Sequence, residues 1–338
     1  MKSITELRHL ASALREAHRA RSRCALVTIV ATTGSTFRRV GAAMLVREDG
    51  SVVNALSGGC PQRDLVERAQ RVISGERSHY VAYNADHGLD LLLEMGCGGT
   101  LEVFIESVGG DITTFIAALD DAIASREPFR MRTHFPAADA GRPVVRRING
   151  STGLLGDSDE ACCTEVPGGG RVLDESFLPP IRLVIAGASP EAAELARAAS
   201  LVGWHGVVVD AAPERLEQIV LPAEGWECQV ARPEHVVASA RIDAGTAFVS
   251  MTHNLERDIG YLQAARDGHA FYLGALGSRE RAGLMAGAVD STRLHVPAGL
   301  DVGSNTSPEI ALAVVAEALA YRHRRDGRSL RHLDGAIH

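Results

Sequence analysis

Along the first hundred residues, apolar positions alternate between helical and strand-like spacing. Leu7, Leu10 and Leu14 recur three or four residues apart, which predicts an amphipathic helix. Runs rich in Val, Ile and Leu predict strands, and Asp49-Gly50 between two of them is typical of a hairpin turn. The predicted elements are helices at 5–21 and 64–73 and strands at 25–30, 43–46, 51–53 and 100–105. They indicate an N-terminal α/β domain with a mixed sheet.

From residue 182 onward, short apolar runs alternate regularly with helical spacing. The run 183–186, a Gly-containing turn, an Ala-rich helix to about residue 202 and the run 206–209 predict a βαβ unit. Further predicted elements are strands at 246–250, 270–273 and 294–296 and a final helix that begins at Ser307-Pro308. This alternation predicts a Rossmann-like domain with a doubly wound parallel sheet.

The length of the chain favours two domains that each bury a core, because 338 residues exceed one ordinary domain. The apolar pattern weakens between about 108 and 180, where short runs are separated by turn residues. We therefore expect an N-terminal α/β domain over 1–108, an adjunct segment and linker over 109–180, and the Rossmann-like domain over 181–330.

Composition and charge narrow the class of protein further. Hydrophobic residues make up 46% and charged residues 23% of the chain, which is typical of soluble globular proteins. A net charge of -7 argues against a nucleic-acid partner. The charged N-terminus has no apolar core of a signal peptide, and no run approaches the length of a membrane span. We expect a cytoplasmic protein that makes no membrane contact, with a homodimer as the default assembly.

The loop Ser57-Gly58-Gly59-Cys60 carries the most distinctive chemistry in the sequence. It joins a predicted strand to a helix that opens with Pro61, so Cys60 lies at or beside the N-cap. The helix dipole and unpaired N–H groups favour the thiolate there, so we expect a lowered pKa for Cys60. A soft thiolate suits metal binding or sulfur transfer, and Gly58 and Gly59 let an anion approach the backbone amides. A strained turn with Cys60 as filler is an equally open interpretation.

Two more polar bends strengthen the case for a ligand site in this domain. Gly96-Cys97-Gly98-Gly99 has the same composition and also adjoins a strand. The bend 32–36, which includes Ser35, and the nearby Arg38 can offer hydroxyls and a guanidinium group to a phosphate, although a solvated hairpin loop explains this bend as well. Six cysteines without Cys-x-x-Cys spacing make neither a disulfide framework nor a closed zinc site.

The turn that starts at Gly187 only partly matches a dinucleotide fingerprint. In Gly187-Ala188-Ser189-Pro190-Glu191-Ala192, serine occupies the second glycine position, and Glu191 places a negative charge where phosphates would lie. Asp210, about 20 residues further on, could hold a ribose hydroxyl or cap its own loop. His253 follows a strand and is the best proton-handling candidate, with a packing or capping role equally open.

In this order, the motifs resemble those of the XdhC/CoxI family, the accessory proteins of xanthine dehydrogenase and related molybdenum hydroxylases. The matching segments in the first domain are Thr33-Gly34-Ser35, Arg38, Gly41, Ser57-Gly58-Gly59-Cys60 and Gly96-Cys97-Gly98-Gly99 with the strand at 100–104. Those in the second domain are Met251-Thr252-His253 and the segments 272–279, 295–303 and 307–310.

The resemblance implies a protein that binds molybdenum cofactor (molybdopterin) and shelters it while a cysteine desulfurase replaces an oxo ligand with sulfur. It further implies insertion of the cofactor into a molybdenum hydroxylase apoenzyme of the xanthine or aldehyde dehydrogenase type, by a chaperone rather than a catalyst. Cys60 would then be the thiolate beside the metal, with Cys97 in support. The amides of the glycine loops, together with Arg38, would face the pterin phosphate.

The chain departs from the family pattern at two motifs. Pro61-Gln62 follows Cys60 where the family usually has a small apolar residue and a glutamate, and the usual Gly-Ala-Gly-His turn reads Gly187-Ala188-Ser189-Pro190. Two other functions remain open from the sequence. An NAD(P)-dependent oxidoreductase of unknown substrate would explain the βαβ unit, and an interaction scaffold would explain a turn that has lost its ligand.

Overall fold

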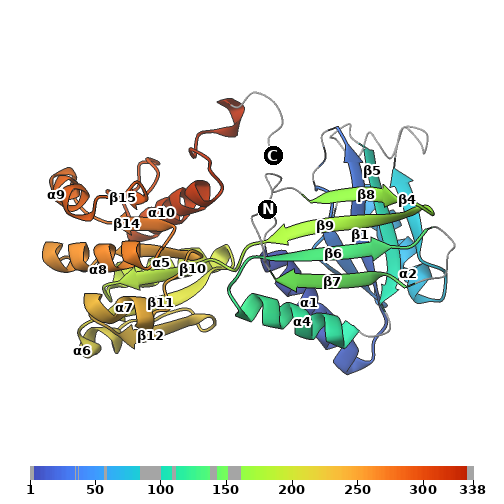
Figure 1. Ribbon diagram of the computed structural model, residues 1–338, viewed down its shortest axis with the longest axis horizontal. Helices are drawn as coiled ribbons and strands as arrows, with labels where there is room; N and C mark the ends of the chain where they lie inside the picture. The colour runs from blue at the N-terminus through green and yellow to red at the C-terminus, as the bar shows by residue number, and fades with distance from the viewer. Residues whose placement is uncertain are drawn as a thin grey trace. The chain divides into compact units, whose positions relative to one another are not determined.

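The computed structural model describes residues 4–34, 36, 38–56, 59–83, 100–108, 112–137, 143–150 and 161–332. The chain divides into two compact units, Met1–Pro179 and Pro180–His338 (Figure 1). The elements of the first unit are α1 (Ile4–Ala20), β1 (Cys24–Thr33), β2 (Ala43–Arg47), β3 (Val52–Val53), α2 (Gly59–Ile73), β4 (His79–Tyr83), β5 (Thr100–Val108), α4 (Ile112–Ala124), β6 (Phe129–Phe135), β7 (Val145–Gly150), β8 (Cys162–Val166) and β9 (Gly170–Phe177).

The elements of the second unit alternate along the chain. They are β10 (Arg182–Ala186), α5 (Pro190–Leu201), β11 (His205–Asp210), α6 (Pro213–Leu216), β12 (Trp226–Val230), the 3₁₀ turn η2 (Pro233–His235), α7 (Val236–Ser239), β13 (Thr246–Ser250), α8 (Leu255–Asp267), β14 (Tyr272–Ala275), α9 (Arg279–Val289), β15 (Leu294–His295), α10 (Ser307–Arg322) and the 3₁₀ turn η3 (Leu330–His332).

The first unit contains a five-stranded sheet in the order β3-β2-β1-β5-β4. Because side chains alternate along β1, Ala25, Val27 and Ile29 pack with helix α2, whereas Leu26 packs with α1 on the opposite face. The predicted α/β class is confirmed, but the described strand pairs of this sheet are all antiparallel rather than mixed. A short turn, residues 48–51, joins β2 to β3, and such a turn imposes antiparallel pairing.

The stretch expected as an adjunct segment and linker contributes a second sheet to this unit. Helix α4 is followed by the antiparallel order β7-β6-β9-β8. Phe135 and Leu173 of this sheet pack against Val30 and Phe104 of the five-stranded sheet. Two ion pairs also connect the sheets, Arg146 with Glu106 and Arg171 with Glu102. The second sheet thus encloses part of the core of the first unit.

The second unit is built on six parallel strands in the order β12-β11-β10-β13-β14-β15. Leu183 and Ile185 pack with α5 and α10 on one face, and Val184 packs with α7, α8 and α9 on the other. This confirms the Rossmann-like prediction. The strand order reverses beside β10, so the carboxyl ends of β10 and β13 form the switch point at which open α/β sheets bind ligands.

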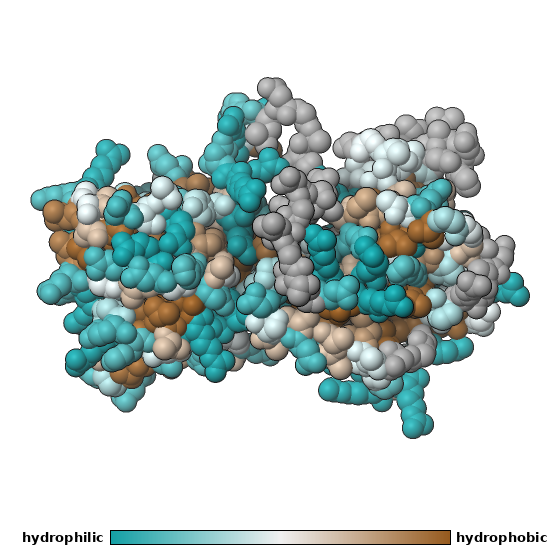
Figure 2. All heavy atoms as spheres, viewed as in Figure 1, coloured by the Kyte–Doolittle hydropathy of each residue, from teal (hydrophilic) through white to brown (hydrophobic). Residues whose placement is uncertain are grey.

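The visible surface is mainly polar, with apolar groups in separate small areas (Figure 2). Leu201, Val220 and Leu312 are exposed apolar residues from different elements or loops of the second unit. Within the described ranges, no helix is both long enough and apolar enough to cross a bilayer.

Candidate functional site

Helix α2 begins at Gly59, so the backbone of Cys60 lies in the first turn of this helix. The first turn carries no acidic residue. Unpaired N–H groups and the positive helix end favour a thiolate at such a position, and the first acid of the helix, Asp64, follows one turn later. Ser35, Ser57, Gly58, Cys97, Gly98 and Gly99 lie outside the described residues. The role of the two cysteine loops therefore remains a prediction.

Arg38, expected to face a phosphate, forms an ion pair with Glu6 of α1. Its side chain is 29% exposed and that of Glu6 is 41% exposed. Partly exposed pairs of this kind contribute at most about 1 kcal/mol, so a phosphate could displace Glu6 at little cost. The hydroxyl of Thr36 donates to the carbonyl oxygen of Arg38 at 2.9 Å and shapes this bend. The structure places Arg38 on a polar bend, as expected, but already beside a carboxylate.

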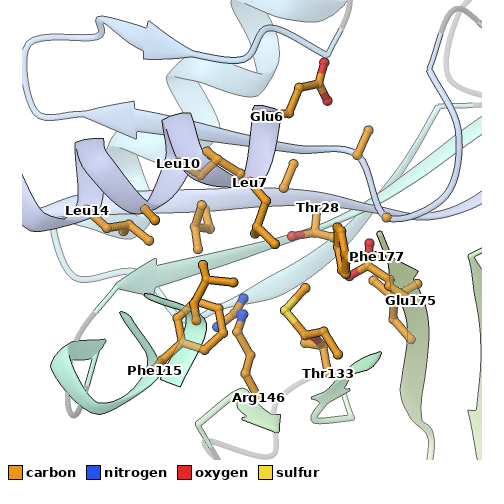
Figure 3. A pocket seen from close by; sticks show the side chains of 18 of the residues that line it. Glu6, Leu7, Leu10, Leu14, Thr28, Phe115, Thr133, Arg146, Glu175 and Phe177 are labelled. Atoms are coloured by element: carbon orange, nitrogen blue, oxygen red, sulfur yellow. The ribbon is translucent and has the colours of Figure 1, made fainter. Parts of the chain in front are cut away.

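The first unit also encloses a cavity of about 70 Å³ that the sequence did not predict (Figure 3). Its wall is mainly apolar and comes from α1, α4 and both sheets, with Glu6, Thr28, Thr133, Glu175 and Arg146 as polar members. Small-molecule sites usually measure at least about 300 Å³, and one water occupies about 30 Å³. The cavity therefore has room for a few waters.

In the second unit, Gly187 brings two loops of the switch point together. Its φ is +107°, a conformation that side chains other than glycine rarely adopt. A Cβ on Gly187 would lie 2.7 Å from the carbonyl oxygen of Met251. The turn after β10 therefore packs directly on the loop 251–253 after β13, and only glycine permits this approach.

Asp210, the candidate ribose ligand, is 1% exposed at the end of β11. One carboxylate oxygen accepts the N–H of Ala188 at 3.0 Å, and the other accepts the N–H of Ala212 at 3.0 Å. These contacts agree with the capping role that the sequence left open, and the ribose role stays a prediction. Asp210 ties the turn after β10 to the loop after its own strand.

Ser189 and Glu191 form the N-terminus of α5. The hydroxyl oxygen of Ser189, the N-cap residue, accepts the N–H of Ala192 at 3.3 Å. Hydrogen bonds from its own backbone N–H and from the Ser189 hydroxyl lower the pKa of Glu191, and His253 adds a smaller electrostatic contribution. The carboxylate is ionised at neutral pH, so a negative charge already lies at the positive end of this helix.

His253 is exposed on the loop after β13, with a φ of +60°. This loop is anchored by Asp258 of α8, which the sequence reasoning missed. Asp258 is 1% exposed and accepts hydrogen bonds from Ser250 Oγ at 2.7 Å and Thr252 N at 2.9 Å. Its other oxygen pairs with Arg281 at 2.8 Å.

The sequence did contain a signal for this anchor. Asp258 shares helical spacing with the buried residues Tyr261, Leu262 and Ala265, which marks a carboxylate on the apolar face of α8. In the part of the chain that the structure describes, no three His, Cys, Asp or Glu side chains are grouped so that they could hold a metal ion.

The fold and these sites define a class of protein: a Rossmann-like unit with a modified phosphate turn, joined to an α/β unit with a cysteine at the start of a helix. Family models agree with this class, since "XdhC and CoxI family" matches residues 17–84 and "XdhC Rossmann domain" matches residues 183–318. The chain belongs to the XdhC/CoxI family.

Relatives match both units. The chain is 26% identical over 311 residues to a Bacillus subtilis protein named as a probable subunit of xanthine dehydrogenase, covering 88% of this chain and 93% of the relative. It is 27% identical over 306 residues to the "Molybdenum cofactor insertion chaperone PaoD" of Escherichia coli, covering 88% and 83%. A crystal structure described as a xanthine dehydrogenase from Bacillus halodurans aligns with a TM-score of 0.75 and 26% identity, covering 94% and 97%.

Proposed function

We propose that the protein binds molybdenum cofactor, shelters it, supports its sulfuration and inserts it into a xanthine dehydrogenase-like hydroxylase. The observation that carries the proposal is the likeness, over 88% of this chain, to an Escherichia coli protein named a molybdenum cofactor insertion chaperone. The Bacillus subtilis relative is named as part of a xanthine dehydrogenase, which supports a client enzyme of this type. In this function the protein carries molybdenum cofactor for another enzyme and does not keep it as its own cofactor.

Cys60 is the residue to which we assign contact with the cargo. Its backbone position in the first turn of α2 supports a thiolate, and a thiolate is a soft ligand suited to molybdenum. The amide groups of the adjoining glycine loops and Arg38 would hold the pterin phosphate by hydrogen bonds and charge. A cysteine desulfurase would supply the sulfur, and the client apoenzyme would then take over the cargo.

Replacement of Cys60 tests this assignment. We expect Cys60→Ser to lose retained molybdenum and pterin after gel filtration with molybdenum cofactor, and to lose activation of a client apoenzyme. Cys228→Ser is the matched control, because Cys228 is an exposed cysteine of the second unit. It should behave like the unaltered protein.

Two outcomes would count against the proposal. If Cys60→Ser retains the cofactor and activates the client normally, Cys60 has no part in holding the cargo. If the unaltered protein holds no cofactor but retains NAD(H) and oxidises or reduces a substrate with it, the accessory function itself is wrong.

A further inference from the structure

Many Rossmann-like domains bind a dinucleotide, whose pyrophosphate lies at the first βα turn. Such a turn normally offers free backbone N–H groups at a helix N-terminus, with glycines that let the phosphates approach closely. Whether this chain can take NAD(P) therefore depends on which donors of the turn 187–192 remain available.

The backbone donors of this turn are largely committed within the protein. The N–H of Gly187 donates to the carbonyl oxygen of Val209 at 2.8 Å. That of Ala188 donates to Asp210, and that of Ala192 donates to the hydroxyl of Ser189. Pro190 has no N–H to offer. Most of the backbone donors that would bind a pyrophosphate thus already have partners from the chain itself.

Glu191 adds a charge that opposes a phosphate. Glu191 lies in the first turn of α5, and hydrogen bonding at this helix start lowers the pKa of its carboxyl, so that the group is charged at neutral pH. The protein has therefore placed an anion at the positive end of α5, where a pyrophosphate would otherwise lie. A bound dinucleotide would have to displace this carboxylate or lie beside it, and two like charges a few ångströms apart repel each other.

The ribose end of the site is also occupied. Asp210 is 1% exposed, and each of its carboxylate oxygens already accepts a backbone N–H. An acid that holds a ribose must direct an oxygen outward toward the hydroxyl groups. Here the acid is directed into the turn and stabilises the conformation that brings Glu191 to the start of α5. The residues present do not fit a dinucleotide.

We propose that the Glu191 carboxylate takes the place of a phosphate group at the start of α5. The second unit therefore has the Rossmann architecture but excludes NAD(P). This inference does not depend on the proposed cofactor function, because it concerns a different unit and a different class of ligand. The second unit then acts without a bound nicotinamide nucleotide, and Glu191 and Ser189 are the residues that exclude this nucleotide.

A gain of nucleotide binding is the decisive test. ADP-ribose carries the ribose and pyrophosphate of NAD, and calorimetry measures its dissociation constant directly. We expect no detectable binding by the unaltered protein and binding by Glu191→Gln at least tenfold tighter than the detection limit, because removal of one like charge near a phosphate is worth about 1.4 kcal/mol or more. The double variant Ser189→Gly/Glu191→Gly, which opens the close approach as well, should bind more tightly still.

Two controls separate the phosphate site from general effects of charge. Glu194→Gln makes the same change one turn further along α5, where the glutamate pairs with Arg197, and it should gain nothing. Adenosine, which has no phosphate, should bind all four proteins equally. Circular dichroism and the thermal midpoint verify that each variant is folded.

The proposal fails if the unaltered protein binds ADP-ribose or NADH as tightly as Glu191→Gln does. It also fails if both Glu191→Gln and the folded double variant gain no affinity for ADP-ribose. Neither result bears on Cys60 or on cofactor retention, so failure here is distinguishable from failure of the accessory function.

Discussion

Asp258 shows how a single buried carboxylate can determine the shape of a loop at the ligand edge of a sheet. It is 1% exposed and holds Ser250, Thr252 and Arg281 together. Replacement with alanine leaves these donors and the guanidinium group without their shared acceptor. We predict that Asp258→Ala lowers the free energy of unfolding by about 3 kcal/mol, measured by urea denaturation of the second unit's transition.

Asp267 at the end of the same helix provides the control for this prediction. Its side chain is 67% exposed and pairs with the neighbouring Arg266. Exposed pairs contribute at most about 1 kcal/mol, so Asp267→Ala should change stability little. Equal effects of the two substitutions would mean that the buried network around Asp258 does not stabilise the loop.

Gly187 and Asp210 show which features of single residues could be predicted from the sequence and which could not. The spacing from Gly187 to Asp210 correctly predicted that the two residues lie at the ends of adjacent strands. Gly187 has a positive φ, which explains why this position is a glycine. Sequence could not say where the Asp210 carboxylate points. That direction depends on the N–H groups of Ala188 and Ala212, which meet it only after the loops have folded.

At the scale of elements, α10 begins with a capping box that makes its stability depend on pH. The Glu309 carboxylate accepts the N–H groups of Asn305 at 2.8 Å and Thr306 at 2.9 Å. These bonds favour the charged form and lower the pKa of Glu309 below its ordinary value. The stabilisation is therefore complete above the unfolded-state pKa of about 4.3, and it is lost as pH falls through the lower folded-state pKa.

We predict that Glu309→Gln lowers the thermal midpoint at pH 7 and that the difference from the unaltered protein shrinks as pH falls below about 4. Thermal melts between pH 7 and pH 3 measure this. Glu280→Gln makes the same change in the first turn of α9, where Ser278 caps the helix instead. A difference for Glu309→Gln that stays constant across this range would show that the charge of the carboxylate does not matter.

Helices and strands were predictable from the sequence where the apolar residues follow a clear helical or strand-like spacing. The helices expected at 5–21 and 64–73 correspond to α1 and α2, although α2 begins earlier, at Gly59, because Pro61 is compatible with a first helical turn. Strand β6 alternates clearly between buried and exposed positions, yet the sheet around it was not predicted. The two edge strands of that sheet, β7 and β8, bury little, so their sequences carry no comparable apolar alternation.

At the scale of the molecule, sequence could predict two units from length and pattern, but not how strands are ordered within the sheets. Strand order depends on contacts between distant segments, such as β1 with β5, whose pairing joins residues about eighty positions apart. Among the residues that the structure describes, each hydrophobic cluster draws its members from one unit only. The two units should therefore respond separately to damage in one of them.

The buried pair of Arg146 and Glu106 tests this separation. Their side chains are 13% and 7% exposed, and the pair joins the two sheets of the first unit. Arg146→Ala leaves Glu106 buried without its counter-charge, which typically costs about 3 to 5 kcal/mol. We predict that hydrogen exchange measured by mass spectrometry will accelerate in β5, β6 and β7 but not in β10 or β13.

A matched substitution makes the outcome specific. Arg132 pairs with Asp174 on the same small sheet, but their side chains are 53% and 44% exposed, so Arg132→Ala should change exchange little. If Arg146→Ala instead accelerated exchange equally in both units, the chain would unfold as one cooperative body. Unchanged exchange in β10 and β13 would mean that the second unit keeps its fold, with Glu191 in place at the start of α5, while the first unit loosens.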